Sequence, residues 1–155
     1  MKTSNLAIFA LGGALMLSAC GNNEEAEIEA RMSAVATFMI EEMDETADGI
    51  WDNAGYILTE EGEESLFPET DEEWAVVIQA TDDLIAQTRR LQSEEFAGDD
   101  EEWIAISEGL VVAAERVRAA AEARDEDELF DAGGQVYRVC LACHQRYALD
   151  IQRIR

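Results

Sequence analysis

Apolar residues recur at steps of three and four along most of the chain after residue 25, which is the spacing of one face of an α-helix. The pattern predicts four helices, over about residues 26–58, 70–93, 100–123 and 126–151. No stretch alternates between apolar and polar residues as a half-buried strand does. We therefore expect an all-α protein, an antiparallel up-down-up-down four-helix bundle with short loops.

Each predicted helix has one continuous apolar face, which we expect to point into the core. The expected inward residues are Ile28, Met32, Val35, Ala36, Met39, Met43, Ala47, Ile50, Trp51, Ala54 and Leu58 in the first helix, Trp74, Val77, Ile78, Thr81, Leu84, Ile85, Thr88 and Leu91 in the second, Trp103, Ile106, Leu110, Ala113, Val117 and Ala120 in the third, and Leu129, Ala132, Val136, Cys140, Cys143, Tyr147 and Ile151 in the fourth.

Capping residues and breaks predict where these helices begin and end. Thr70 with Glu73 three residues later predicts a capping box at the start of the second helix, and Asp99 or Asp100 begins the third. The segment 59–68 is expected to be a loop. A bend in the long first helix is expected near Gly49.

The start of the chain has the pattern of a secretory signal. Lys2 precedes an apolar run over residues 6–17, and small residues stand before Cys20. The run is too short to span a bilayer comfortably. One interpretation is ordinary cleavage with an incidental cysteine.

The other interpretation comes from a resemblance, since Leu17-Ser18-Ala19-Cys20 is similar to the bacterial lipobox. The resemblance implies a lipoprotein signal peptide over 1–19, lipidation of Cys20, a short tether over 20–25 and a helical domain over 26–155. The lipid would be the only membrane contact. The residues after Cys20 resemble those of lipoproteins sorted to the outer membrane of Gram-negative bacteria, so we expect a lipid-anchored periplasmic protein.

The formal charge of −24 on 155 residues makes nucleic acid an unsuitable partner. A chain of this length forms one domain. Two interpretations of the acidity stay open. The carboxylates either keep a solvated surface soluble or steer a basic partner protein toward this one.

Cys140-Leu141-Ala142-Cys143-His144 is the attachment motif of c-type haem. The two thiols lie one helical turn apart, so each can add to one haem vinyl group. His144 follows Cys140 by four residues and projects from the same helix face, where its imidazole can bind the iron. The sequence thus predicts one haem c with its iron per chain, attached to the last helix.

A redox pair, a zinc site and a disulfide each fit this motif less well than haem does. A thioredoxin-like redox pair needs neighbouring strands, and none is expected. A structural zinc site needs four ligands, whereas His144 is the single histidine of the chain and no second cysteine pair exists. A disulfide between cysteines three apart within a helix has poor geometry. The sequence shows no base–nucleophile pair, so we do not expect an enzyme.

A four-helix bundle with this motif close to the C-terminus resembles the class II cytochromes c, which include cytochrome c′. Most other c-type domains supply a Met after the motif, but no Met follows Met43 here. Tyr147 matches the tyrosine that the family places after the motif, and Gly134 matches a family glycine. Ala148 and Tyr137 depart from the family pattern, at an arginine and a second glycine. The resemblance also implies a homodimer.

Gly133 and Gly134 stand within the fourth helix, where each costs about 1 kcal/mol relative to alanine. Two interpretations remain open at this stage. Either a haem or a neighbouring helix approaches closely there, or the segment is loosely packed.

The resemblance implies that the side of the iron opposite His144 faces the first helix. The first and fourth helices are expected to be antiparallel, so the position of His144 along the fourth helix can be matched to a position along the first. This match places about residues 32–40 of the first helix opposite the iron. Met39 is then the best-placed sixth ligand, although a methionine on this face can equally be core packing. Members of the family often have an arginine four residues before the distal residue. If Arg31 is that arginine, the resemblance makes Val35 the distal residue, and Val35 cannot bind iron. In either case Arg31 is expected near a haem propionate.

Two functions follow from these two distal arrangements. Ligation by Met39 describes a six-coordinate electron-transfer cytochrome that exchanges electrons with a redox partner protein. An open apolar pocket at Val35 describes a five-coordinate protein that binds nitric oxide or carbon monoxide. The sequence leaves both possible.

Overall fold

The computed structural model describes residues 19–148. The predicted signal peptide lies outside these residues apart from Ala19, as does residue 151, and the side chain of Cys20 is not described either. The elements are α1 (Ala19–Phe38), η1 (Met39–Met43), α2 (Asp44–Trp51), β1 (Tyr56–Thr59), β2 (Gly62–Ser65), α3 (Asp71–Leu91), α4 (Glu101–Ala123) and α5 (Glu126–Tyr147).

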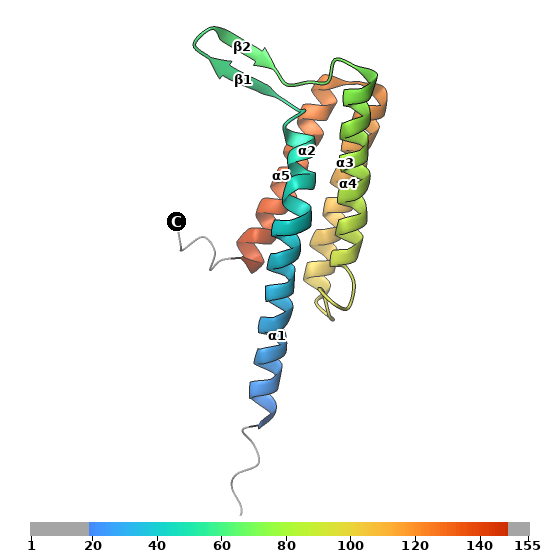
Figure 1. Ribbon diagram of the computed structural model, residues 1–155. Helices are drawn as coiled ribbons and strands as arrows, with labels where there is room; N and C mark the ends of the chain where they lie inside the picture. The colour runs from blue at the N-terminus through green and yellow to red at the C-terminus, as the bar shows by residue number, and fades with distance from the viewer. Residues whose placement is uncertain (1–18, 149–155) are drawn as a thin grey trace, which may run out of the picture.

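The described chain is mostly helical, as predicted, and its long helices form an antiparallel bundle (Figure 1). α1, η1 and α2 follow one another as a single rod. α3, α4 and α5 then alternate in direction beside it (Figure 1). Close backbone packing joins α2 with α3, α3 with α4 and α4 with α5.

The start of α3 is the predicted capping box. The Thr70 hydroxyl accepts a hydrogen bond from the Glu73 N–H at 3.2 Å, and the Glu73 carboxylate accepts from the Thr70 N–H at 3.0 Å. Hydrogen bonds from the backbone N–H groups of Glu69, which has the largest effect, and Thr70 lower the pKa of Glu73. Asp100 rather than Asp99 begins α4, since its carboxylate accepts from the Trp103 N–H at 2.9 Å.

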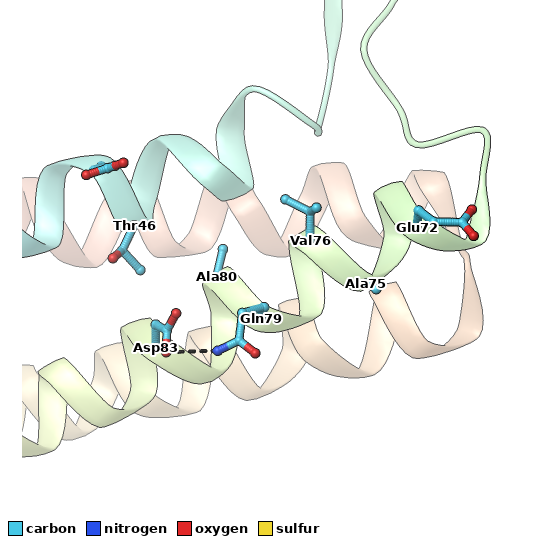
Figure 2. A pocket seen from close by; sticks show the side chains of 8 residues that line it. Thr46, Glu72, Ala75, Val76, Gln79, Ala80 and Asp83 are labelled. Carbon is cyan, nitrogen blue, oxygen red and sulfur yellow. Dashed lines mark hydrogen bonds between the residues drawn. The ribbon is translucent and has the colours of Figure 1, made fainter.

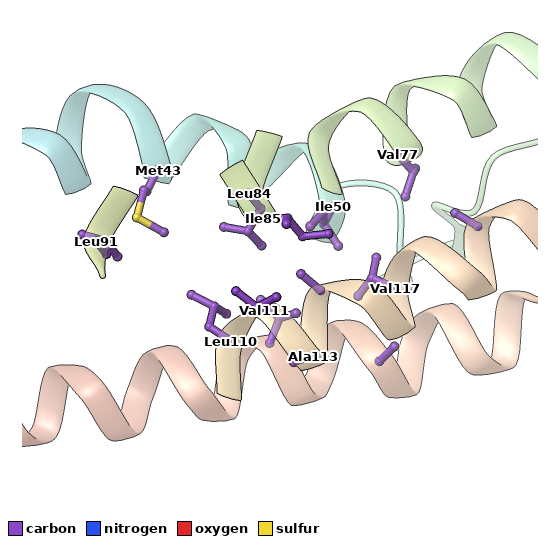
Figure 3. Close-up of a cluster of buried hydrophobic side chains, with 14 of the residues drawn as sticks. Met43, Ile50, Val77, Leu84, Ile85, Leu91, Leu110, Val111, Ala113 and Val117 are labelled. Carbon is purple, nitrogen blue, oxygen red and sulfur yellow. The ribbon is translucent and has the colours of Figure 1, made fainter. Parts of the chain in front are cut away.

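The predicted apolar faces form one continuous core (Figure 3). Ile50, Val77, Val117, Leu129 and Val136 are fully buried. The buried hydroxyls of Thr81 and Thr88 are satisfied within α3, where they donate to the carbonyls of Val77 and Leu84 at 2.7 Å. Burial of this apolar surface is the main stabilising contribution to the bundle.

The first helix differs from its prediction at its C-terminal end. It ends at Trp51 instead of continuing to residue 58, and Leu58 is 81% exposed rather than inward. Gly55 has φ +155°, a backbone conformation that L-residues rarely adopt, and the β-prone sequence Tyr56–Thr59 follows it. The helix therefore stops there and the chain turns into a strand.

A β-hairpin replaces the end of the predicted first helix and the first part of the loop expected over 59–68, so the expectation of a protein without strands was wrong. β1 and β2 pair antiparallel from Tyr56 opposite Ser65 to Thr59 opposite Gly62. Apolar and polar residues alternate along a strand when one of its faces is buried in a core. Both strands here are exposed throughout, so the sequence has no such alternation that would predict them.

The first helix is also irregular at a different place from the one expected. Gly49 lies within regular α2, where a Cβ would stand only 2.9 Å from Cβ of Ala80, so this glycine permits close packing of α2 on α3. The irregular turn is η1, a π-helical segment in which the Asp44 N–H bonds the Met39 carbonyl. Ile28 was expected inward but is 51% exposed.

Within the described residues, no helix combines the length and the apolar character that crossing a membrane requires.

Candidate functional site

The predicted haem-attachment motif occupies the last two turns of α5. Cys140 and Cys143 are free thiols, both half-buried, whereas His144 is exposed. Burial raises the pKa of the Cys140 thiol to about 11, with a further contribution from Cys143, and burial also raises the pKa of Cys143. Redox-active cysteine pairs have lowered pKa values instead, so this environment does not suit a thioredoxin-like pair.

His144 shares a face of α5 with Tyr137 and Gly133. It follows them by seven and eleven residues, close to two and three turns of an α-helix at about 3.6 residues per turn. This face is directed at the rod formed by α1, η1 and α2, because Gly133 contacts the end of that rod.

The contact at Gly133 joins α5 to α2. The indole Nε1 of Trp51 donates a hydrogen bond to the Gly133 carbonyl at 3.2 Å. A Cβ at Gly133 would lie 3.8 Å from Cδ1 of Trp51 and 4.0 Å from Cγ2 of Ile50. A neighbouring helix does contact Gly133, but a Cβ at these distances would make only ordinary van der Waals contact, so this approach does not require a glycine.

Close backbone packing of the kind that joins α4 with α5 does not occur between α5 and any part of the rod, α2 included, in the described residues. The rod and α5 meet through side chains instead, as Trp51 does with Gly133. Further along, Met39 of the rod and Cys140 of α5 both pack against the common core.

The same contact fixes which part of the rod lies level with the motif. His144 is eleven residues beyond Gly133, and the residues eleven before Ile50, Trp51 and Ala54, all about equally close to Gly133, are Met39, Ile40 and Met43. Because antiparallel helices advance by nearly the same rise of about 1.5 Å per residue, the segment 39–43 lies at about the depth of His144. Val35 lies about one turn further toward the N-terminus of the rod.

The candidate distal residues line the inner face of the rod at this depth. Val35 and Phe38 are buried, while Met32 and Met39 are half-buried and pack against the same core cluster as Cys140. Met39 is also the first residue of η1. π-helical turns change the direction of side chains and often occur at functional sites, and the sequence pattern gave no signal for this one.

Arg31 lies against the loop between α3 and α4. A Cβ on Gly98, whose φ is +57°, would overlap the Arg31 guanidinium, so glycine leaves the room that this side chain occupies. None of the ion pairs among the described residues involves Arg31. The residue is half-buried, and its guanidinium lies against Gly98.

Tyr147 holds the end of α5 against the start of α4. Its hydroxyl donates to Oδ2 of Asp100 at 3.0 Å, and its ring packs edge-on against Trp103 with centroids 4.9 Å apart. Burial and the bond to Asp100 raise the pKa of Tyr147 to about 12. Arg146 adds an exposed ion pair with Glu102 at 3.0 Å. In this structure Tyr147 fixes the orientation of the helix that carries the motif.

The carboxylate of Asp100 makes this junction sensitive to acid. The Trp103 N–H, followed by the Tyr147 hydroxyl, lowers the pKa of Asp100, so its contribution is present above the unfolded pKa of about 3.9 and is lost as the pH falls through the folded value. We expect Asp100→Asn, which keeps an N-cap side chain, to lose less stability on acidification than the parent. Urea unfolding between about pH 7 and pH 3 measures this, and an unchanged pH dependence would contradict it.

Two grooves lie outside the motif itself. One, of about 510 Å³, lies on the α5 face that carries His144 and is lined by Trp51, Ala54, Phe130, Asp131, Gly133, Gly134, Tyr137 and Arg138. The other, of about 470 Å³, lies between α2 and α3 and is lined by Glu45, Thr46, Glu72, Ala75, Val76, Gln79, Ala80 and Asp83 (Figure 2). The second groove includes no residue of α5, so only the first belongs with the motif.

Comparison with models of known protein families finds no match, and comparisons with curated proteins and with solved structures find no significant match either. In the described residues, no group of three or more His, Cys, Asp and Glu side chains could hold a metal ion. The assignment of this site therefore depends on the residues and their geometry.

Proposed function

We propose that this chain is a class II-type cytochrome c, an electron-transfer protein with one covalently attached haem. The observation that carries the proposal is the position of Cys140-x-x-Cys143-His144 at the end of α5, where Cys140 packs against the same core as Met39 of the rod. Free thiols one turn apart and an exposed imidazole on the adjoining face are the donor set that c-type attachment uses.

Each residue of the site has a defined task under this proposal. Cys140 and Cys143 would hold the haem by adding their thiols to its two vinyl groups, and His144 would supply a nitrogen ligand to the iron. Met39 would supply a thioether sulfur, and Arg31 the cation for a propionate. A bound haem would supply one-electron exchange between ferric and ferrous iron.

A five-coordinate protein that binds nitric oxide or carbon monoxide is the second candidate. It is favoured by the apolar character of Val35 and Phe38, which have no ligand atom; both are buried here, and the Phe38 ring stacks on Phe96 with centroids 5.1 Å apart. The two functions differ only in whether Met39 binds the iron.

Optical spectra of the purified ferric and ferrous protein distinguish these two functions. We expect a weak Met–iron band at roughly 695 nm in the ferric protein, absent from Met39→Ala. Met32→Ala is the matched control, since Met32 is also half-buried on the same core, and it should retain the band. A high-spin ferric spectrum together with a shift on adding carbon monoxide would establish the second candidate instead.

We also propose that the protein is a periplasmic lipoprotein anchored through Cys20, with no other membrane contact. α1 begins at Ala19, so a lipid on Cys20 would attach at the free end of the rod. Met39 would then stand roughly 28 Å along the helix from the anchor, at a rise of about 1.5 Å per residue. The part of α1 over residues 25–30, whose side chains are exposed, would hold the site away from the membrane surface.

A further inference from the structure

The β-hairpin projects from the end of the bundle where α2 ends (Figure 1). All eight residues of its two strands are exposed, including the successive apolar residues Tyr56, Ile57 and Leu58. The edge-on contact between Tyr56 and Phe67, with centroids 5.3 Å apart, anchors only its base. Exposed apolar residues on such a projecting element indicate a surface that contacts another molecule.

The free edge of β1 carries unpaired backbone groups. The Leu66 N–H donates to the Gly55 carbonyl at 3.0 Å, which makes this a hydrogen-bonded pair at the base of the hairpin. Hydrogen-bonded and non-hydrogen-bonded pairs alternate along an antiparallel ladder, so the N–H and C=O groups of Tyr56 and Leu58 point outward. In the described part of the chain, no hydrogen bond from another element reaches these groups.

The two edges of the hairpin differ in their protection. Natural proteins protect exposed edges with charged residues, proline or a bulge. β1 has none of these, and its register with β2 is continuous. β2 carries Glu63 and Glu64. A strand from another molecule can therefore add to β1 more readily than to β2.

The charges around the hairpin define the chemistry of that strand. Glu60, Glu61, Glu63 and Glu64 stand at the tip and on β2, and no Lys or Arg occurs between Arg31 and Arg89. A basic segment is attracted to this surface. A second copy of this chain brings the same glutamates to the contact, and the like charges repel.

We propose that β1 is a docking edge for an extended segment of a partner protein in which basic and apolar side chains alternate. The backbone of that segment pairs with Tyr56 and Leu58. Its apolar side chains lie on one face of the extended sheet and cover Leu58 and Tyr56, while its basic side chains lie on the opposite face, which carries Glu64. Docking itself does not involve haem. Identifying the occupant as the redox partner rests on the proposed function.

The test measures binding of a fluorescein-labelled peptide of alternating lysine and valine to the purified full-length protein, by fluorescence anisotropy. We expect binding that weakens with added salt and that a lysine–glycine peptide of equal charge does not reproduce. Leu58→Pro removes an outward N–H without breaking a bond to β2, and it should weaken binding roughly tenfold. Ser65→Pro makes the matching change on the edge of β2 and should leave binding unchanged.

A second pair of variants tests the charges. Glu60→Gln with Glu61→Gln should weaken binding several-fold, whereas Glu29→Gln with Glu115→Gln removes equal charge elsewhere and should not. Amide NOEs between the strands show whether Leu58→Pro keeps the hairpin. If it does not, Leu58→Ser, which should also weaken binding, takes its place.

Three results would overturn the docking edge: no binding of the lysine–valine peptide, equal binding by the edge variant and the parent, or a homodimer in sedimentation that the edge variant dissociates. Absence of haem in a protein that still binds the peptide would refute the proposed function and leave the docking edge intact. Loss of peptide binding in a protein that retains haem would do the reverse.

Discussion

Replacing both Cys140 and Cys143 with alanine is expected to give a folded protein that carries no covalent haem. Both thiols are half-buried at the margin of the core, and alanine fits the same helical positions. Loss of both thioether links removes the attachment itself, whichever residue lies on the distal side. Expression in a host that assembles c-type cytochromes, followed by haem staining of a denaturing gel, measures the result.

The control for this variant is Ala142→Ser, which changes the residue between the same two cysteines and should retain the stain. Far-UV circular dichroism of both variants should match the parent, because α5 is held by Leu129, Ala132 and Val136 rather than by the thiols. Haem staining that survives in the double variant, or that is absent from the parent, would overturn the proposed attachment.

Trp103→Ala is expected to cause the largest loss of stability of any single substitution in the region of the site. Its side chain is 3% exposed, its indole N–H donates to the Leu91 carbonyl at 2.7 Å, and its ring contacts Tyr147. Truncation leaves a cavity and an unpaired carbonyl, for which a cost of about 3–5 kcal/mol in the free energy of unfolding is typical. Urea unfolding followed by circular dichroism measures this.

Trp103→Phe separates the two parts of that effect. Phenylalanine keeps most of the buried ring surface but cannot donate to the Leu91 carbonyl, so it should cost about 1–3 kcal/mol. A loss of less than about 1 kcal/mol in the alanine variant would show that α3, α4 and α5 do not depend on this contact. Because Trp103 also orients Tyr147, the alanine variant should loosen the end of α5 that carries the motif.

Much of the bundle could be predicted because its signals are local. The Thr70 capping box, the Asp100 cap and the Trp74–Leu91 face of α3 each depend on residues within one or two turns of one another. A buried helical face also leaves a period in the sequence, which the four predicted helices followed. Errors occurred where that burial is missing, as at exposed Ile28 and in the exposed hairpin.

The candidate site likewise has one part that the sequence predicts, the Cys140–His144 motif, and one part that it does not, the distal side. Cys140, Cys143 and His144 are recognisable from their spacing because one turn of helix places them together. The distal side could be approximated only as residues 32–40, since helix boundaries were uncertain. The contacts of Ile50, Trp51 and Ala54 with Gly133 supplied a depth of residues 39–43, a segment that begins with Met39.

Residues close together in the chain define the helices, their caps, their core faces and the Cys140–His144 motif, so all of these could be predicted from the amino-acid order. The π-helical turn at Met39, the hairpin beyond Gly55 and the contact of α5 with the rod emerged only from the folded chain. The hairpin is exposed and leaves no buried face in the sequence pattern. The contact of Trp51 with Gly133 joins residues 82 apart, for which a local pattern carries no information.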